Sequence, residues 1–344
     1  MSGTPGAGGY WPERVVPPYH SCMVGIHDIS SAHAFLGSRV HRTPVLSSRS
    51  LGERAGCALY LKAESLQRTG SFKVRGVLNR LRLLTPAERE RGLITISAGN
   101  HAQAVAYASS LEGLRATVVM PEHAVASKVE ASRAYGADVV LHGDIFAAFE
   151  HMEQLRQRDG ATLIHPFDDP GVIAGQGTVG LELCDDVHDL DCVIVPVGGG
   201  GLLSGVAAAV KALQPRARVI GVEPVGAAAL RAGLDAGEPV RLERVDTIAD
   251  GLGAPATGTH VLEHVTTLVD DVITVTDDDI ADALRLILER CKLLVEPAGA
   301  AAVAALLAGR VHVRAGARVA AVLSGGNIDL QRLTRLLHEN GRQQ

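Results

Sequence analysis

The sequence has 344 residues, of which 47% are hydrophobic and 21% are charged, and its formal net charge at pH 7 is −5. These proportions are close to the globular average, so they exclude wholesale disorder and allow a large core. The negative charge, and the lack of a basic run with interleaved aromatic residues, argue against a nucleic-acid binder. No segment approaches the length of a membrane span, and the N-terminus has no signal-peptide pattern. We therefore expect neither a nucleic-acid nor a membrane partner.

The first residues and the cysteines carry weaker information. Residues 1–28 are rich in glycine and proline and are expected to form a loosely ordered lead-in. The five cysteines are irregularly spaced and include no CxxC pair. This arrangement indicates reduced thiols rather than a zinc site or a disulfide framework, and it favours a cytoplasmic protein.

From residue 58 onward, short apolar runs alternate with segments of helical periodicity. The runs predict strands at Ala58–Leu61, Leu93–Ser97, Ala116–Met120, Asp138–Leu141, Thr162–His165, Cys192–Val197, Val219–Val222, Val272–Val275 and Arg318–Ser324. Because the runs are continuously apolar, they are typical of parallel sheets that helices cover on both faces. The predicted fold class is α/β.

Two of the helices expected near the C-terminus have clear signatures. Thr276 and Asp279 form a capping-box pattern, and the apolar positions Ile280 and Leu284 follow on one helical face. The alanine-rich segment Ala298–Ala308 is predicted to be a buried helix, because its small side chains allow close packing.

The segment Arg68–Gly76, RTGSFKVRG, holds one of five lysines in a chain with 33 lysines and arginines. Where charge alone is needed this chain uses arginine, but only lysine can lose its proton and attack a carbonyl to form a Schiff base. Lys73 is therefore a candidate nucleophile, with a solvated charge at a helix start as the ordinary alternative. Lys62 alternates with Leu61 along a predicted strand and is interpreted as an ordinary strand side chain.

Three predicted strands run into polar or glycine-rich turns, where ligands of open α/β sheets bind: SAGNHAQ at 97–103, GGGG at Gly198–Gly201 and SGGN at Ser324–Asn327. The four glycines match neither the dinucleotide fingerprint nor the Walker pattern. They suit either a cradle of N–H groups for one small phosphate or a tight turn that needs positive φ. Asn100 and His101, taken alone, also fit ordinary loop chemistry and packing at a helix start.

Together these segments resemble one family. SFKVRG, SAGNHAQ, GGGGL and SGGN occur in the order and approximate spacing of the fold-type II pyridoxal-phosphate enzymes, and more narrowly of the threonine/serine dehydratase and serine racemase group. The resemblance continues through HPFDDPGVIAGQGT, VIGVEP, TIADGL and LLVEPAGAA, and it covers residues 28 to 330.

The resemblance implies a tryptophan synthase β-like fold with two domains, each built on a mostly parallel sheet covered by helices. The large domain would comprise residues 29–91 and 166–344 and the small domain residues 92–165, with pyridoxal 5'-phosphate in the cleft between them. A homo-oligomer, expected to be a dimer, is also implied. Because the chain ends soon after the last predicted strand, we do not expect the regulatory domain of feedback-inhibited dehydratases.

The resemblance also assigns cofactor contacts to individual residues. Lys73 would bind the cofactor aldehyde and, once released, act as general base toward the Cα proton of the substrate. Asn100 would contact the ring 3-oxygen, and Ser324 would face the pyridine nitrogen. The full set implied for the cofactor is Lys73, Phe72, Asn100, Gly198, Gly199, Gly200, Gly201 and Ser324.

The reaction implied is dehydration of a β-hydroxy amino acid, L-threonine or L-serine, to a 2-oxo acid and ammonia. The substrate carboxylate would lie at a helix N-terminus, on N–H groups of Ser97, Ala98, Gly99 and His101. Serine racemase is the first alternative. Racemases of the group carry a serine as second base where this chain has Ala98, and a polar asparagine in place of Phe167, so both positions favour the dehydratase. The remote alternative is an inactive amino-acid-binding protein, which the intact site residues argue against.

Two departures from the family pattern bear on substrate and metal. Residues 145–149 read IFAAF within HGDIFAAF, whereas threonine dehydratases read closer to GDNFDEA, so another β-hydroxy amino acid such as hydroxyaspartate stays open. The divalent-cation site of the group would use Glu223 and the carbonyl of Ala227, but its second acid is replaced by Ala229. A cation site is therefore doubtful.

Overall fold

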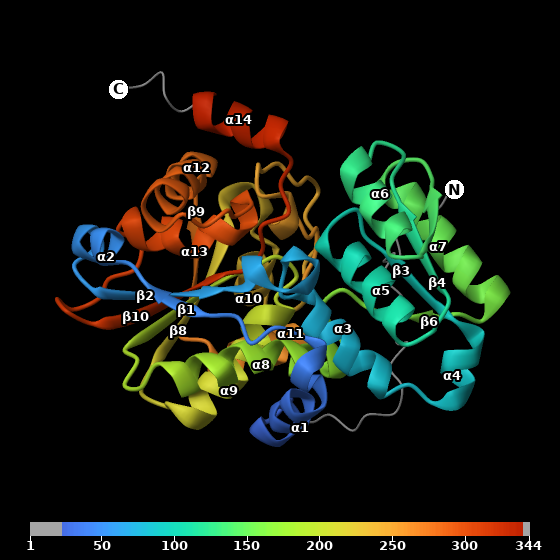
Figure 1. Ribbon diagram of the computed structural model, residues 1–344, viewed down its shortest axis with the longest axis horizontal. Coiled ribbons are helices and arrows are strands. Elements are labelled where there is room, and N and C mark those ends of the chain that lie inside the picture. The colour runs from blue at the N-terminus through green and yellow to red at the C-terminus, as the bar shows by residue number, and fades with distance from the viewer. Residues whose placement is uncertain (1–22, 340–344) are drawn as a thin grey trace, which may run out of the picture.

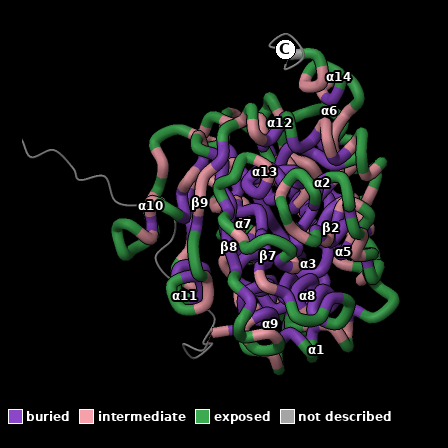
Figure 2. The backbone as a smooth tube through the Cα atoms, turned by 90° about the vertical axis from the view of Figure 1, so that its left-hand side faces the viewer, coloured by how far each residue is buried: buried purple, intermediate pink, exposed green. Residues whose placement is uncertain are grey.

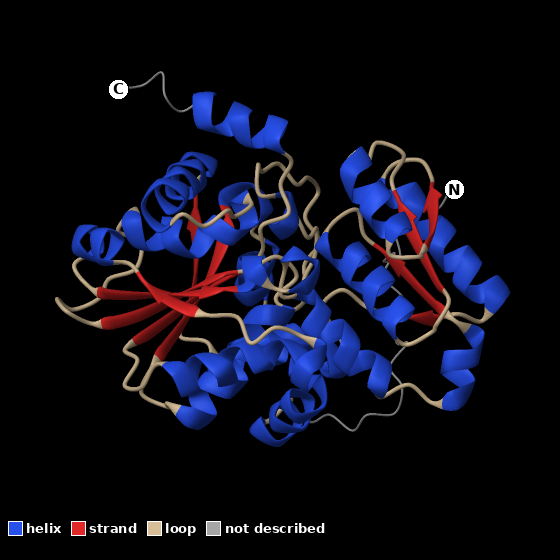
Figure 3. Ribbon diagram, in the orientation of Figure 1, coloured by secondary structure: helices blue, strands red, loops and turns tan. Residues whose placement is uncertain are grey.

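The structure is a computed structural model that describes residues 23–339, and its strands form two separate sheets (Figure 1, Figure 3). The six-stranded sheet has the order β1-β2-β10-β7-β8-β9 and the four-stranded sheet the order β5-β4-β3-β6. The strands are β1 (Val45–Ser47), β2 (Ala58–Ala63), β3 (Leu93–Ile96), β4 (Ala116–Met120), β5 (Asp138–Leu141), β6 (Thr162–Leu163), β7 (Cys192–Pro196), β8 (Arg218–Pro224), β9 (Asp271–Val275) and β10 (Arg318–Leu323).

Helices cover both faces of both sheets (Figure 1). On the large sheet, α2, α12 and α13 lie on one face and α1, α8, α9 and α11 on the other. On the small sheet, α5 and α6 lie opposite α7. The helices are α1 (Ile26–Leu36), α2 (Arg49–Ala55), α3 (Lys73–Arg82), α4 (Pro86–Arg91), α5 (Asn100–Leu111), α6 (Ala126–Ala134), α7 (Ile145–Asp159), α8 (Pro170–Asp186), α9 (Gly201–Leu213), α10 (Ala229–Ala236), α11 (Thr259–Leu268), α12 (Asp277–Leu286), α13 (Pro297–Leu307) and α14 (Leu330–Glu339).

The predicted fold class is confirmed, because every predicted strand is present and nearly all pairings are parallel. The strand that sequence reasoning missed is β1, which has only three residues and pairs antiparallel with β2. Such a short edge strand carries too few positions to show any periodicity. No helix within residues 23–339 is both long and apolar enough to cross a membrane.

The strands of the small sheet all lie within residues 93–163, inside the segment expected to form the small domain. The exact domain limits stay a prediction. The lead-in expected over residues 1–28 lies mostly outside the described residues. Its last part differs from expectation, because α1 begins at Ile26 and buries Ile29, Ala32 and Leu36.

The core of the large domain is divided by its sheet. Along β7, Cys192 and Ile194 pack with the helices of one face, and Val193 and Val195 pack with those of the other. Successive side chains of a strand point to opposite faces, so a strand buried on both sides must be apolar throughout. Figure 2 shows the resulting buried interior.

The two helices with clear sequence signatures form as predicted. Thr276 caps α12, its Oγ accepting the Asp279 N–H at 3.1 Å while the Asp279 carboxylate accepts the Thr276 N–H at 3.0 Å. The alanine-rich α13 is buried along almost its whole length and packs against α12 and the large sheet.

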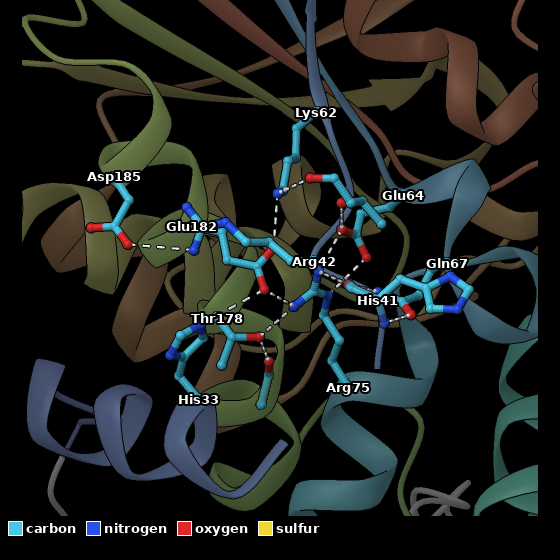
Figure 4. A network of polar contacts seen from close by, with 12 residues as sticks. His33, His41, Arg42, Lys62, Glu64, Gln67, Arg75, Thr178, Glu182 and Asp185 are labelled. Atoms are coloured by element: carbon cyan, nitrogen blue, oxygen red, sulfur yellow. Dashed lines mark hydrogen bonds and ion pairs between the residues drawn. The ribbon is translucent and has the colours of Figure 1, made fainter. Parts of the chain in front are cut away.

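A fully buried ion network ties β2, α3 and α8 together (Figure 4). Lys62 Nζ lies 2.8 Å from Glu182 Oε2 and also donates to the carbonyl of Thr43 at 2.7 Å. Arg75 Nη1 lies 2.7 Å from Glu182 Oε1, and Arg75 Nε lies 2.8 Å from Glu64 Oε2. Lys62 is thus a strand side chain, as interpreted, but it is buried, which the alternation with Leu61 did not predict.

Candidate active site

A cavity of about 540 Å³ lies at the carboxyl ends of β3, β7 and β10, between the two sheets. Its inner part is formed by the three turns that the sequence singled out together with the start of α3. The residues that line this part include Phe72, Lys73, Ser97, Ala98, Gly99, Asn100, His101, Phe167, Gly198, Gly199, Gly200, Gly201, Glu296, Ala298 and Ser324. The structure therefore brings all the predicted cofactor and carboxylate residues to one cavity.

The RTGS turn is folded against the SGGN turn. Gly70 adopts φ +69°, and a Cβ there would lie 2.2 Å from Asn327 Oδ1, so both backbone conformation and space require glycine. Phe72 N–H donates to the carbonyl of Ser324 at 3.1 Å. This contact fixes the entry to α3, so that Lys73, the first residue of the helix, lies in the cavity.

The Lys73 amine has no carboxylate within salt-bridge distance among residues 23–339. Its Nζ donates to the carbonyl of Pro166 at 2.7 Å and lies 5.3 Å from the centre of the Phe72 ring. Burial lowers the pKa of this amine from 10.5 to about 8. A lysine in this setting has a substantial neutral fraction near neutral pH, as a nucleophile or base requires.

Asn100 is held by hydrogen bonds on both sides of its amide. Its Oδ1 accepts from Asn327 Nδ2 at 2.8 Å, and its Nδ2 donates to Glu296 Oε1 at 2.5 Å. One Nδ2 hydrogen stays available for a further acceptor in the cavity. The amide orientation is therefore set before any ligand binds.

Glu296 is the cavity residue that sequence reasoning missed. It precedes α13 without capping that helix, and burial raises the pKa of its carboxyl from 4.5 to about 7. Gly325 leaves room for it, because a Cβ there would lie 2.4 Å from Glu296 Oε1. The segment LLVEPAGAA had been recognised as family-like, but a single glutamate at a helix start carries no local signal for this contact.

The four-glycine turn leads into α9, whose N-terminus faces the cavity without a side-chain cap. Gly200 has φ +92°, the positive φ that a tight turn requires. Close packing also contributes, since a Cβ on Gly199 would lie 2.1 Å from the ring of Phe167. The first N–H groups of α9 have no intrahelical partners, so the turn also provides the donors that a phosphate needs.

The SAGNHAQ turn provides a second helix N-terminus. α5 begins at Asn100, and Gly99 N–H donates to Ser97 Oγ at 3.1 Å. The His101 ring points away from this turn, with Nε2 lying 3.0 Å from the carbonyl of Ile164. Burial, followed by the nearby charge of Lys73, lowers the pKa of His101 to about 3. His101 thus packs at the helix start, and its backbone N–H belongs to the helix N-terminus that a ligand can use.

Ser324 closes the inner part of the cavity. Its side chain is buried, and Oγ donates to the carbonyl of Ala298 at 3.3 Å. No acidic group lies within hydrogen-bond distance of this hydroxyl among the described residues. A ring nitrogen placed beside Ser324 would therefore meet a neutral hydroxyl.

The side chain of Glu223, expected as a cation ligand, is hydrogen-bonded to backbone N–H groups of α10. Its two carboxylate oxygens accept the N–H groups of Leu230 and Arg231, at 2.8 and 2.9 Å, at the start of α10. Burial raises the pKa of its carboxyl to about 7. Ala227 and Ala229 are buried nearby and contribute no side-chain oxygen. The cation site stays a doubtful prediction.

The mouth of the cavity contains contacts that sequence reasoning did not anticipate. Lys128 Nζ of α6 lies 2.5 Å from Asp250 Oδ2 of the large domain. The Arg241 guanidinium lies 4.6 Å from the centre of the Phe146 ring of α7. Both contacts link the two domains across the opening, and long sequence separations hide such pairs from motif analysis.

Similar proteins identify the family to which this chain belongs. Residues 37–325 match the pyridoxal-phosphate dependent enzyme family, and the chain belongs to it. The L-threonine ammonia-lyase of Thermotoga maritima is 44% identical over 318 residues, or 92% of this chain and 79% of that protein. The catabolic L-threonine dehydratase of Escherichia coli is 42% identical over 315 residues, or 91% of this chain and 96% of that protein. The structure of maize serine racemase has a TM-score of 0.87 at 39% identity, covering 92% of this chain and 98% of that one.

These likenesses confirm the predicted family, the lyase class and pyridoxal phosphate as the cofactor. The described residues fit that molecule: an amine of lowered pKa suits its aldehyde, an uncapped helix N-terminus suits its phosphate, and a fixed amide suits its ring oxygen. The individual contacts belong to the proposal below.

Proposed function

We propose that this protein eliminates water from L-threonine and L-serine, giving a 2-oxo acid and ammonia. The main support is Lys73, a cavity lysine whose amine is buried without a counter-ion and whose pKa is lowered to about 8. The L-threonine ammonia-lyase and the L-threonine dehydratase described above are named for their action on L-threonine. Each shares about two-fifths of its aligned residues with this chain. The residues predicted for the cofactor and for the substrate carboxylate all line the same cavity.

Pyridoxal phosphate, when bound, supplies an aldehyde for the substrate amine and a ring that withdraws electrons from Cα. Lys73 Nζ, released as a neutral amine, removes the Cα proton. The Cα–H and Cβ–O bonds break and water leaves. The released enamine then takes up one water and loses ammonia, so the atoms balance. Asn100 and Ser324 would orient the ring, and Ser324 would present a neutral hydroxyl to its nitrogen.

The substrate carboxylate would bind at the N-terminus of α5, where the first N–H groups have no intrahelical partners. Ser97, Ala98, Gly99 and His101 form this turn, with the ring of His101 directed away from it. The carboxylate would then be held on the same side of the cavity as Asn100. Both contacts depend on the single turn that joins β3 to α5.

Racemisation is the second candidate, because maize serine racemase is among the similar structures. Ala98 lines the cavity where racemases of the group have a serine as second base. A methyl group cannot donate a proton, so reprotonation from that side should be negligible. Phe167, in place of an asparagine, lies against Gly199 and adds no proton donor.

Chiral analysis of the products from L-serine tests this proposal. We expect pyruvate and ammonia in equal amounts, with D-serine far below pyruvate. Ala98→Ser should raise the ratio of D-serine to pyruvate, modestly, because one hydroxyl lacks neighbours that tune its proton affinity. If the wild-type protein formed D-serine as fast as pyruvate, racemisation would replace dehydration as the proposed function.

We also infer a homodimer located in the cytoplasm. The cysteines described by the structure, Cys57, Cys184, Cys192 and Cys291, are all free thiols, which suits a reducing compartment. Sedimentation of the purified protein would test the dimer.

A further inference from the structure

The mouth of the cavity is lined by apolar side chains from both domains. Ile145, Phe146 and Phe149 belong to the first turns of α7, in the small domain, and line this cavity. Leu252, Ala254 and Pro255 come from the large domain and line the same cavity. The inner cavity, by contrast, is formed mainly by glycine turns and polar side chains.

Helix α7 exposes large apolar side chains in its first turn, next to the face that packs on the small sheet, and Phe149 also belongs partly to that packing. Ala148 and Met152 are fully buried against the small sheet and supply the packing that holds the helix. Ile145 and Phe146 are 43% and 47% exposed, although they are large and apolar. Exposed apolar groups that gather in a cavity are stabilised when a ligand covers them, and they mark binding surfaces.

The charges at the mouth do not favour an acidic substrate. Lys128 is paired with Asp250, which also lies 3.3 Å from Arg332 Nη1. The Arg241 guanidinium lies 4.6 Å from the centre of the Phe146 ring, so it is engaged in a cation–π contact but keeps its charge. Glu150, which also lines the mouth, would repel a second carboxylate.

From these observations we propose that the mouth selects β-hydroxy amino acids whose β-substituent is apolar and larger than the methyl group of threonine. This inference rests on the proposed function and specifies its substrate class. A methyl group adds one carbon beyond Cβ and would leave most of the wall uncovered. An ethyl or phenyl group would reach farther toward Ile145, Phe146 and Phe149. Each methylene buried in an apolar pocket is worth roughly tenfold or more in kcat/KM.

The kinetic test compares L-serine, L-threonine, L-3-hydroxynorvaline and L-threo-3-phenylserine as substrates of the holoenzyme. We expect kcat/KM for 3-hydroxynorvaline or phenylserine to exceed that for L-threonine by roughly tenfold. A preference for L-threonine over both larger substrates would overturn this inference and leave the proposed function intact. A preference for threo-3-hydroxyaspartate would overturn it in favour of recognition by Arg241. Turnover of none of these substrates would overturn the proposed function itself.

Substitutions in α7 test which side chains produce the preference for a larger apolar β-substituent. Phe149→Ala and Ile145→Asn should each lower the ratio of kcat/KM between phenylserine and L-serine by roughly tenfold. Leu111→Ala is the matched control, because Leu111 is 51% exposed on α5 but does not line the cavity. It should leave the ratio unchanged. Equal ratios in wild type, Phe149→Ala and Ile145→Asn would show that the α7 wall does not select the substrate.

A binding measurement decides the inference without turnover. L-phenylalanine, L-norvaline and L-alanine lack the β-hydroxyl leaving group, so their affinities can be measured from the change in visible absorbance of the holoenzyme. We expect L-phenylalanine or L-norvaline to bind roughly tenfold more tightly than L-alanine, and Phe149→Ala to remove the difference. Equal affinities for the three amino acids would overturn the inference even if every substrate were inactive.

Discussion

Two groups of buried ionisable side chains each include one residue of the first turn of α3, Arg75 in one group and Lys73 in the other, and their charges are compensated in opposite ways. In the network of Lys62, Glu64, Arg75 and Glu182, each charge has a partner of opposite sign within hydrogen-bond distance (Figure 4). In the cavity, two residues away from Arg75 along the chain, Lys73 donates to a carbonyl and Glu296 accepts from an amide, and within residues 23–339 neither has a partner of opposite charge at salt-bridge distance.

The pKa values follow this difference. Burial opposes both charges in the network, but ion pairing outweighs it, raising the pKa of Arg75 and lowering that of Glu182. In the cavity burial prevails, so the pKa of Lys73 falls to about 8 and that of Glu296 rises to about 7. The network keeps its charges fixed, whereas the cavity keeps groups that exchange protons near neutral pH. Lys62 and Lys73 show that the partner, more than the residue type, decides the role.

Removing the cavity lysine should have the largest effect. Lys73→Ala should lower kcat for elimination by at least about 10³-fold, because nucleophile and base are lost together. Borohydride treatment of the wild-type holoenzyme should attach the cofactor to a peptide that contains Lys73, as mass spectrometry would show. Lys211→Ala is the control, since Lys211 pairs with Asp270 near the surface. Labelling at Lys62, Lys128, Lys211 or Lys292 would contradict the assignment.

Breaking the network should affect stability instead. Glu182→Gln leaves Lys62 and Arg75 without a shared carboxylate, and breaking a buried ion pair costs about 3–5 kcal/mol. The measurement is the shift in the urea unfolding curve. Glu53→Gln is the control, because its pair with Arg49 is exposed and should contribute below about 1 kcal/mol. Equal losses of unfolding free energy in the two variants would show that the buried ion pairs contribute no more than an exposed one.

Much of the fold could be predicted from the sequence because buried parallel strands are apolar at every position. Strand β7, Cys192–Pro196, packs on both faces and therefore stands out without knowledge of its neighbours. The turns at 97–103, 198–201 and 324–327 could be placed at one site because carboxyl ends of parallel strands meet at one edge.

The unpredicted parts depend on contacts between distant segments. The local sequence predicts a strand residue at Lys62 whether its side chain is solvated or buried, and its partner Glu182 lies 120 positions away. Glu296 reads as an ordinary acid before a helix, and only its distance to Asn100 shows that it belongs to the cavity. The apolar wall was noticed as a departure at 145–149, but its position at the mouth needed the structure.

The unpaired carboxyl of Glu296 should make stability depend on pH. Its pKa is about 7 in the folded protein against 4.5 in the reference state, so between these values the folded state binds more protons. Stability due to this group is therefore present below about pH 4.5 and is lost as pH rises toward 7, by at most about 3 kcal/mol. The nearby charges of Lys128, Asp250 and Arg332 modify this value.

Glu296→Gln keeps an acceptor for Asn100 but cannot ionise, so it isolates the effect. The stability of the variant minus that of the wild-type apoprotein should increase from pH 4.5 to 7, as measured by urea unfolding at each pH. A difference for Glu296→Gln that is flat or falls with pH would show that the carboxyl is already stabilised as an anion.

The smallest effect is expected from removing divalent cations, which tests the predicted ligand Glu223. The buried carboxyl of Glu223 is stabilised in a third way. Its two carboxylate oxygens accept the N–H groups of Leu230 and Arg231. Hard divalent cations need six or more oxygen ligands, and Ala229 supplies no carboxylate where the family has one. EDTA should therefore leave the thermal midpoint and the activity unchanged, and added Mg²⁺ or Ca²⁺ should not raise them. A large loss of stability in EDTA that Ca²⁺ reverses would show that backbone carbonyls and water complete a site around Glu223. The same treatment of Glu223→Gln would then locate it, because a site built on this carboxylate should lose its response to Ca²⁺ in the variant.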